Sequence, residues 1–245
     1  MGVLSGWLFG KAQKKAAKQA RRRREEEVFG ELLDRFCRMR QRDGGARFLQ
    51  IGANDGRTND PLFPAIERYD LRGICVEPLP EAFRRLQDTH ADRPGVTLLQ
   101  QAAGSAAGWT ELYVAVPPED ADDEMRRDAE RKATFSHADA ARKARKIGGT
   151  VGERRVRVAT LPDLVREGGL EGIDVLQIDA EGEDWNLLQQ VEGLRRLPAL
   201  VNLEHQGLAE QARIAMQKWL TTHGYVWFEH GRDTCALRVH GPGGL

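Results

Sequence analysis

The chain has 245 residues, of which 37 are lysine or arginine and 37 are aspartate or glutamate, so its formal net charge is zero. This length suits one sizeable core, and α/β sheet proteins of this size are commonly single domains. Eight of the basic residues lie between Met1 and Arg24, where there is no acid, and the 29 that remain stand against 37 acids. The body of the chain is therefore acidic, which argues against a nucleic-acid partner.

The three cysteines, Cys37, Cys75 and Cys235, are widely spaced and odd in number. They form neither a disulfide framework nor a zinc spacing, and they are typical of reduced thiols in a cytoplasmic protein. No apolar run approaches the roughly 20 residues of a membrane-spanning helix. An apolar patch at the start of the chain precedes the basic run instead of following it, which argues against a secretory signal. We therefore expect a cytoplasmic location.

Residues 11–42 lack proline and are rich in residues that favour a helix. Apolar side chains recur at helical spacing from Val28 to Phe36, which favours packing against the domain. The alternative is an amphipathic anchor, with the apolar patch in the lipid interface and the basic run against anionic headgroups. We predict a basic helical extension over residues 1–44, with peripheral membrane contact through residues 1–24 as a hypothesis, and one domain over residues 45–245.

From residue 45 onward, short apolar strands alternate with helical stretches. We expect strands at residues 47–51, 73–77, 96–101, 155–159, 174–179, 200–204, 225–229 and 235–239, and helices at residues 61–69, 80–88, 161–167, 183–196 and 209–223. This alternation predicts an α/β fold with a mostly parallel, doubly wound sheet. The turn from His230 to Asp233 is too short for a crossover, so the last two strands are expected to form a C-terminal antiparallel hairpin.

Residues 117–150 interrupt this alternation with a charged, alanine-rich helical insertion. The insertion leaves a strand near the carboxyl edge of the sheet, where its helices are placed to cover a ligand crevice as a flap. A solvated insertion is the open alternative. His137 lies in this segment and would reach an acceptor only if the flap covers the crevice.

The first expected strand runs directly into a bare turn, Gly52-Ala53-Asn54-Asp55-Gly56. Such a turn allows backbone amides to approach a ligand. A dinucleotide fingerprint requires a third glycine, and Arg57 stands at that position. A dinucleotide-dependent oxidoreductase is therefore the weaker alternative.

The second strand ends at Glu77 and Pro78, and the third leads into Gln101 and Ala102. A carboxylate at the first of these ends can accept hydrogen bonds from both hydroxyls of an adenosyl ribose. Gln101 and Ala102 would then border the adenine. Together with the glycine turn these residues predict an adenosyl site, although each alone is compatible with an ordinary turn or strand end.

The stretches FLQIGANDG, RGICVEP, VLQIDAEGEDW, LVNLEHQ and RDTCALR occur in this order and resemble the FkbM family of S-adenosylmethionine-dependent methyltransferases. The resemblance covers about Arg47 to Val239. It implies a Rossmann-like methyltransferase fold and methylation of a hydroxyl oxygen, commonly on a sugar or a glycosylated product. The implied cofactor contacts are Gly52, Asn54, Asp55, Gly56 and Glu77, to which we add the neighbouring Ala53, Pro78, Gln101 and Ala102.

The resemblance also places Asp179 and Glu181 in the family's Asp-x-Glu-Gly motif. The chain departs from the family pattern in its additional acids after Asp179 and in its insertion, which leaves the acceptor open. Because ligands bind outside the carboxyl ends of the strands, Asp179, Glu181, Glu204 and His205 are expected to converge there. A sugar hydroxyl needs a general base, and His205 is the first candidate because imidazole is largely neutral near pH 7. A packing or capping histidine is the alternative.

Asp179 is expected to orient the substrate or the amino group of the cofactor, and Glu204 to accept hydrogen bonds from the substrate. We also expect Glu181 and His137 to contact the substrate, although the helix dipole favours acids such as Glu181 near a helix start. Asp179 and Glu204 are hard oxygen ligands that suit Mg²⁺, but scattered carboxylates do not specify a metal site, and Mg²⁺ is left unassigned.

The sequence therefore predicts an S-adenosylmethionine-dependent O-methyltransferase that acts on a hydroxyl of a carbohydrate or glycoconjugate. Two alternatives from other classes stay open: the dinucleotide-dependent oxidoreductase, and a non-catalytic module that recruits a partner through its basic tail. The acceptor, the methylated position and the oligomeric state do not follow from the sequence.

Overall fold

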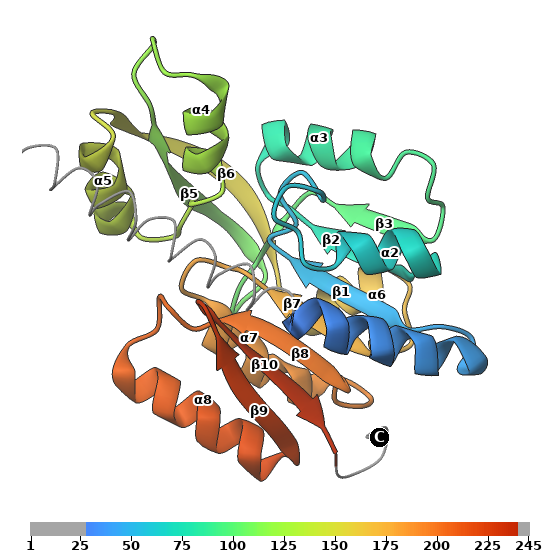
Figure 1. Cartoon of the computed structure of the whole chain (residues 1–245). Coiled ribbons are helices and arrows are strands. Elements are labelled where there is room, and N and C mark those ends of the chain that lie inside the picture. Colours follow the sequence, from blue (N-terminus) through green and yellow to red (C-terminus); the bar gives the residue numbers. More distant parts are fainter. Residues whose placement is uncertain (1–27, 240–245) are drawn as a thin grey trace, which may run out of the picture.

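The computed structural model describes residues 28–239, and its largest feature is a seven-stranded sheet (Figure 1). The strand order is β3-β2-β1-β7-β8-β10-β9. The strands are β1 (Arg47–Ile51), β2 (Arg72–Val76), β3 (Val96–Leu99), β7 (Val175–Ile178), β8 (Leu200–Glu204), β9 (Tyr225–His230) and β10 (Asp233–Arg238). Neighbouring strands are parallel except that β10 runs antiparallel to both β8 and β9. The predicted parallel sheet and C-terminal hairpin are confirmed.

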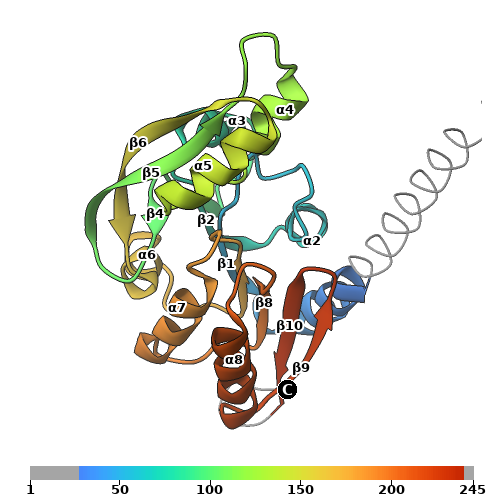
Figure 2. The same ribbon diagram turned by 90° about the vertical axis from the view of Figure 1, so that its left-hand side faces the viewer.

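Helices cover both faces of this sheet. One face carries α6 (Leu161–Glu167), α7 (Asp184–Gln189), the 3₁₀ helix η2 (Gln190–Gly193) and α8 (Glu210–Thr222). The other face carries the helix of residues 28–40, α2 (Phe63–Tyr69) and α3 (Pro80–Thr89). The central strands are buried on both faces, which explains their continuous apolar sequences. The result is the predicted doubly wound, Rossmann-like arrangement, which Figure 2 shows from a second side.

The helix of residues 28–40 belongs to the core. Phe29 and Phe36 are buried in one cluster with α2 and α3. After this helix and the short η1 (Gln41–Asp43), the chain enters β1, and Arg40 lies 3.0 Å from the buried carboxylate of Asp174. The boundary predicted between residues 44 and 45 therefore separates this helix from the core that it completes. The segment 1–24, predicted to contact a membrane, lies outside the described residues.

A second, smaller sheet is the main departure from the prediction. Its strand order is β4-β6-β5, with β4 (Ala102–Ala103), β5 (Gly108–Val116) and β6 (Thr150–Ala159). The strand predicted at residues 155–159 is the end of β6, but it pairs antiparallel with β5 instead of joining the large sheet. We did not predict β5, because its first four residues are all exposed and lack the alternation of a half-buried strand.

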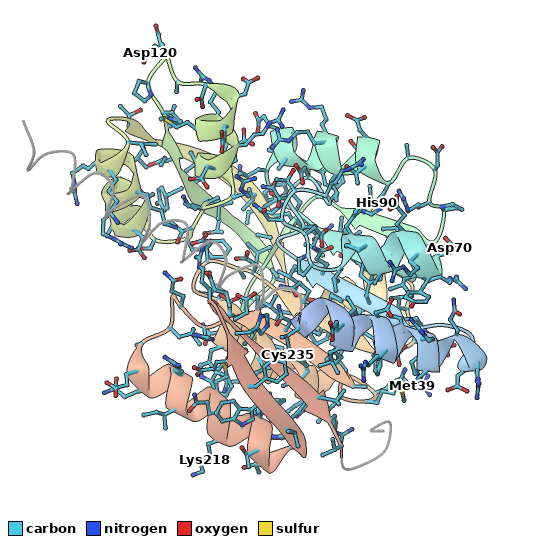
Figure 3. All side chains as sticks on the ribbon, in the orientation of Figure 1. Met39, Asp70, His90, Asp120, Lys218 and Cys235 are labelled. Atoms are coloured by element: carbon cyan, nitrogen blue, oxygen red, sulfur yellow. The ribbon has the colours of Figure 1, made fainter. Side chains whose placement is uncertain are left out.

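The predicted insertion forms α4 (Asp123–Glu130) and α5 (His137–Lys146) between β5 and β6. Asp122 and Ser136 cap these helices, since each side chain accepts a hydrogen bond from an amide three residues later. Residues 102–159, which hold β4, β5, α4, α5 and β6, are called the cap. The cap stands where the parallel strands of the large sheet end, with Asp120 at its outer tip (Figure 3).

The core also accounts for the cysteines. All three are free thiols and buried, with Cys235 inside the strand β10 (Figure 3). Burial raises the pKa of Cys37 and Cys235 to about 12, so both are unreactive thiols near neutral pH. Within residues 28–239, no helix combines the length and the apolar character that crossing a membrane requires.

Candidate active site

A cavity of about 380 Å³ lies between the carboxyl edge of the large sheet and the cap. Small-molecule sites commonly have volumes of roughly 300–1,000 Å³. The large sheet contributes the loops after β1, β2 and β7, Gln101 after β3, Glu204 at the end of β8 and the turn between β9 and β10. The cap contributes Ala102, Ala103, Leu112, Asp128, Phe135 and residues 130–133. The insertion therefore forms one wall of the cavity, as the flap hypothesis predicted.

Gly52, Ala53 and Asn54 line this cavity, but their amides are already used. The amides of Gly52 and Ala53 both donate to the carbonyl of Val76 at 3.0 Å, and that of Asn54 donates to Glu77 at 2.9 Å. The prediction that these amides bind a ligand therefore gains no support from their hydrogen bonds. Gly52 instead lets the turn pass close to the backbone of Asp179, because a Cβ on Gly52 would lie 2.0 Å from the backbone oxygen of Asp179.

Asp55 and Gly56 lie outside the cavity wall. One carboxylate oxygen of Asp55 accepts the amides of Arg57 at 3.0 Å and Thr58 at 2.7 Å, which shapes the turn. Gly56 has a φ of 67°, and a Cβ there would lie 2.5 Å from Leu86 of α3. The two residues fold the turn onto α3, so their placement gives no support to the predicted cofactor contacts.

Glu77 lies beside Pro78 in the cavity wall, at the carboxyl end of β2. Its two carboxylate oxygens accept the amides of Asn54 and Leu79, both at 2.9 Å. Burial raises the pKa of Glu77 to about 7, although these two hydrogen bonds lower it. Each carboxylate oxygen still has capacity to accept another hydrogen bond. Glu77 is therefore suited to a ligand with two neighbouring hydroxyls.

Gln101 and Ala102 border the same cavity. Nε2 of Gln101 donates to Glu167 at 2.6 Å, whereas Oε1 is buried without a hydrogen-bond partner. A buried acceptor without a donor is unfavourable by about 1–3 kcal/mol. A ligand that brings an amino group to this oxygen would remove that cost.

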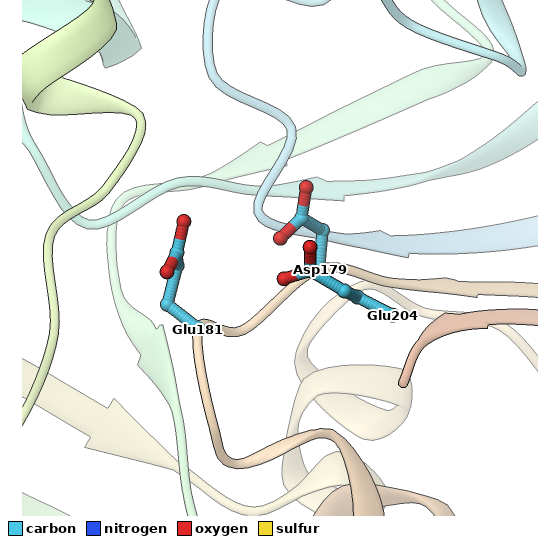
Figure 4. A group of neighbouring side chains, drawn as sticks. All are labelled: Asp179, Glu181 and Glu204. Atoms are coloured by element: carbon cyan, nitrogen blue, oxygen red, sulfur yellow. The ribbon is translucent and has the colours of Figure 1, made fainter. Parts of the chain in front are cut away.

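Three carboxylates meet in the cavity, and we call Asp179, Glu181 and Glu204 the acid triad. Each places an oxygen within 4.8 Å of an oxygen of the other two (Figure 4). Asp179 and Glu181 follow β7 and Glu204 ends β8, so two adjacent parallel strands bring the acids together. The predicted convergence of these three acids is confirmed. Carboxylates alone do not specify a metal, and Mg²⁺ gains no support.

The two flanking acids of the triad each have a cationic partner. Glu204 pairs with Arg232 in the turn between β9 and β10, and Glu181 lies 3.0 Å from Nζ of Lys143 in α5. The carboxylate of Asp179, by contrast, makes no hydrogen bond or ion pair with any residue between 28 and 239. Asp179 is thus the member of the triad whose negative charge is not neutralised by direct contact.

This difference in pairing affects the protonation of the triad. Burial raises the pKa of Asp179 well above its ordinary value, and the charges of Glu204, Asp184 and Glu181 raise it further. The side chain does expose surface where it lines the cavity, yet the protein encloses its remaining sides. Burial also raises the pKa of Glu204 to about 7, although Arg232 lowers it. The triad is therefore poised to hold a proton near neutral pH.

Asp184 fixes the loop that carries two triad members. Its carboxylate accepts the amide of Ala180 at 3.3 Å and that of Gly182 at 3.2 Å. Burial raises the pKa of Asp184 to about 6, against the lowering by these hydrogen bonds. Asp184 lies in the first turn of α7 and away from the cavity wall, so its contribution is to loop geometry.

Neither predicted histidine lies in the wall of the cavity. His205 is buried, with Nδ1 3.0 Å from the hydroxyl of Thr234, and burial lowers its pKa. His137 is exposed at the start of α5, and its ring centroid lies 5.1 Å from that of Tyr113. The predicted roles of His205 as general base and of His137 in substrate binding gain no support from these positions.

Several wall residues were not predicted. Gln50 on β1 and Gln177 on β7 lie side by side in the wall, and the buried Asn202 of β8 donates to Gln177 at 2.9 Å. Polar residues inside otherwise apolar strands were the signal for this row. Phe29 and Lys132 also line the cavity, but they come from distant segments and carry no local signal.

Comparison with known proteins identifies the family. A family profile described as the methyltransferase FkbM domain matches residues 50–227, which is most of the chain. The chain belongs to the FkbM methyltransferase family. The chain thus contains the FkbM methyltransferase domain that the resemblance implied. Among curated proteins, none matches the chain.

Solved structures similar to this FkbM domain include the FkbM methyltransferase of Methylobacillus flagellatus KT. That protein is 13% identical, with a TM-score of 0.47 over 78% of this chain and 42% of that chain. The fibrillarin of Aeropyrum pernix, in complex with S-adenosyl-L-methionine, is 16% identical, with a TM-score of 0.40 over 78% and 65%. The fibrillarin of Methanococcus jannaschii is 10% identical, with a TM-score of 0.37 over 78% and 64%. This chain thus spans less than half the length of the Methylobacillus protein.

Proposed function

We propose that this FkbM domain transfers a methyl group from S-adenosylmethionine to a hydroxyl oxygen of a sugar or glycoconjugate. The observation that carries the proposal is the acid triad, which shares one cavity with groups suited to an adenosyl ligand. When bound, the cofactor supplies a methyl group that is electrophilic because it is attached to a positively charged sulfur. The residues of the chain bind and orient the reactants and accept a proton.

The wall residues fit this cofactor. Glu77 has two oxygens, each with one backbone donor and further acceptor capacity, which suits the two ribose hydroxyls. The unsatisfied Oε1 of Gln101 suits the amino group of adenine. Gly52 has no side chain at the point where the turn contacts the backbone of Asp179. The acid triad provides negative charge that suits a cationic sulfur.

Asp179 is the group that we propose as the general base. A base is most effective when its pKa lies near the working pH, and burial together with neighbouring acids moves the pKa of Asp179 upward from the ordinary range. Its carboxylate is also free of the cations that neutralise Glu181 and Glu204. In this proposal Asp179 takes the proton of the acceptor hydroxyl, the role that sequence reasoning had given first to His205.

A polyhydroxylated acceptor suits the remaining wall. Thr58, Asn59 and Asp60 line it from the loop after β1, and Arg232 and Asp233 line it from the β9–β10 turn. These side chains offer both donors and acceptors to hydroxyl groups. These polar groups favour a sugar over a purely apolar acceptor.

The test is methyl transfer in vitro from labelled S-adenosylmethionine to fractionated cell glycolipids and polysaccharides. Products that gain one methyl group are identified by mass spectrometry and then treated with mild alkali. A methyl ether on a sugar hydroxyl survives this treatment, whereas a methyl ester is hydrolysed. A purified protein that binds neither S-adenosylmethionine nor S-adenosylhomocysteine, or a label confined to nitrogen, sulfur or carboxyl groups, would overturn the proposal.

A further inference from the structure

Lys143 reaches from the cap to the acid triad. Its Nζ donates to the carboxylate of Glu181 at 3.0 Å and to the backbone carbonyl of Lys132 at 2.8 Å. The side chains of Lys143 and Glu181 are only 18% and 19% exposed, so the pair is largely shielded from solvent. Lys132 itself lies in the cavity wall. One ammonium group thus joins α5, the wall segment after α4 and the loop after β7.

Glu181 combines an unusual backbone conformation with a single side-chain partner among residues 28–239. Its φ is 46°, a left-handed conformation that is uncommon for residues other than glycine. Asp184 holds the amides on either side of Glu181, at Ala180 and Gly182, but it does not touch the Glu181 carboxylate. Between residues 28 and 239, Lys143 is the one group that pairs with that carboxylate.

We propose that Lys143 is a positioning residue that holds the cap against the catalytic loop and keeps the side chain of Glu181 turned toward Asp179. The proposal deepens the proposed function, because it assumes that Asp179 and its neighbours form the reacting site. It gives a structural role to helix α5 of the cap, which carries Lys143. The cap closes one wall of the cavity and also sets the charge beside the base.

The charges around Asp179 predict how this arrangement responds to mutation. Four acids face Asp179: Glu181 in its own loop, Asp184 in the first turn of α7, Glu204 of β8 and Asp233 of β10. Two cations act through these acids, since Arg232 pairs with Glu204 and Lys143 of α5 pairs with Glu181. A nearby cation favours the ionised carboxylate and a nearby anion disfavours it. Removing the Lys143 cation therefore raises the pKa of Asp179, and removing the Glu181 anion lowers it.

Hydrogen exchange measured by mass spectrometry on the full chain tests the fastening without any acceptor. We expect Lys143→Met to speed amide exchange roughly tenfold in residues 130–136 and 180–183, and Lys143→Arg to restore most of the protection. Lys146→Met is the matched control, because Lys146 is exposed on the same helix and makes no ion pair within the described chain. Equal exchange in Lys143→Met and Lys146→Met would overturn the fastening.

The carboxyl titration of Asp179 tests the electrostatic part. In protein labelled with ¹³C at aspartate carboxyls, the Asp179 resonance is assigned by its loss in Asp179→Asn. We expect its midpoint to move up by roughly one pH unit in Lys143→Met and down in Glu181→Gln. An unchanged midpoint in Lys143→Met would overturn the electrostatic part, because it would show that the Lys143 charge does not act on Asp179. Failure of the wild-type protein to bind S-adenosylhomocysteine would instead defeat the proposed function and leave the fastening to the exchange experiment.

Discussion

Substitution of Gly52 by alanine tests how closely the turn after β1 approaches the end of β7. Gly52 has a φ of 76°, and a Cβ built on it lies 2.0 Å from the backbone oxygen and 3.1 Å from the backbone carbon of Asp179. Real Cβ atoms do not approach another atom to within 3.0 Å. The backbone must therefore move in Gly52→Ala, and the segment that moves carries the proposed base.

The expected cost has three parts. The left-handed conformation costs alanine about 1–2 kcal/mol relative to glycine. Separating the two loops weakens the hydrogen bond from the Asp179 amide to the Ile51 carbonyl, which is 3.1 Å long, and such a bond contributes about 1 kcal/mol. Forcing extra volume into a packed region costs about 1–3 kcal/mol. The sum of about 3–6 kcal/mol is a large share of a typical domain stability of about 5–15 kcal/mol.

Gly169 provides the matched control, because its φ is 69° and a Cβ there meets no atom within 4 Å. Gly169→Ala should lose only the conformational part, about 1–2 kcal/mol. Urea unfolding followed by circular dichroism measures both variants. Calorimetric titration with S-adenosylhomocysteine should show that folded Gly52→Ala binds more weakly than Gly169→Ala. Equal loss of stability in the two variants would refute the close contact at Gly52.

Three further results are expected. Wild-type affinity for S-adenosylhomocysteine should decline below pH 7, because the ribose hydroxyls need the ionised carboxylate of Glu77. Glu77→Gln should weaken this binding roughly tenfold at pH 8 and remove the decline. Calorimetry at pH 6 and pH 8 measures both effects. Asp179→Asn should lower the rate of methyl transfer by about 10²–10⁴ while S-adenosylhomocysteine still binds, and an unchanged rate would eliminate Asp179 as the base. The pKa values of Glu77 and Glu204, about 7 in the folded chain, lie above the ordinary 4.5, so their ionisation destabilises the fold. The free energy of unfolding should therefore fall by about 1.5 kcal/mol between pH 6.5 and pH 8 in urea titrations, and a rise over this range would contradict that assignment.

The sequence predicted the site residues best where a residue directly follows or ends a strand. The apolar run of β1 followed by Gly52, and the strand that ends at Glu77, predicted two adjacent loops of one crevice, and the structure joins them through the hydrogen bond from Asn54 to Glu77. Asp179 and Glu204 followed the same logic, because parallel strands end at one edge of a sheet. These predictions needed only the position of a residue relative to its own strand.

The cap was predicted less well. Its helical segment was recognised from composition, but β5 was missed because its first four residues are all exposed. The strand at residues 155–159 was assigned to the large sheet, because the sequence of a short apolar strand does not identify the strand that it pairs with. Strand pairing is settled by contacts between distant segments, and here the nine-residue β5 competes for β6.

By itself, the sequence determined the order of the elements, the parallel sheet with its terminal hairpin and the set of acids at the sheet edge, because periodicity and strand ends are local properties of the chain. Only the tertiary structure decided which acid stays unpaired, that His205 turns away from the cavity, and that Lys143 reaches Glu181 from 38 residues away. The pairing and the pKa of a carboxylate depend on every group that encloses it, and those groups come together only when the whole domain folds.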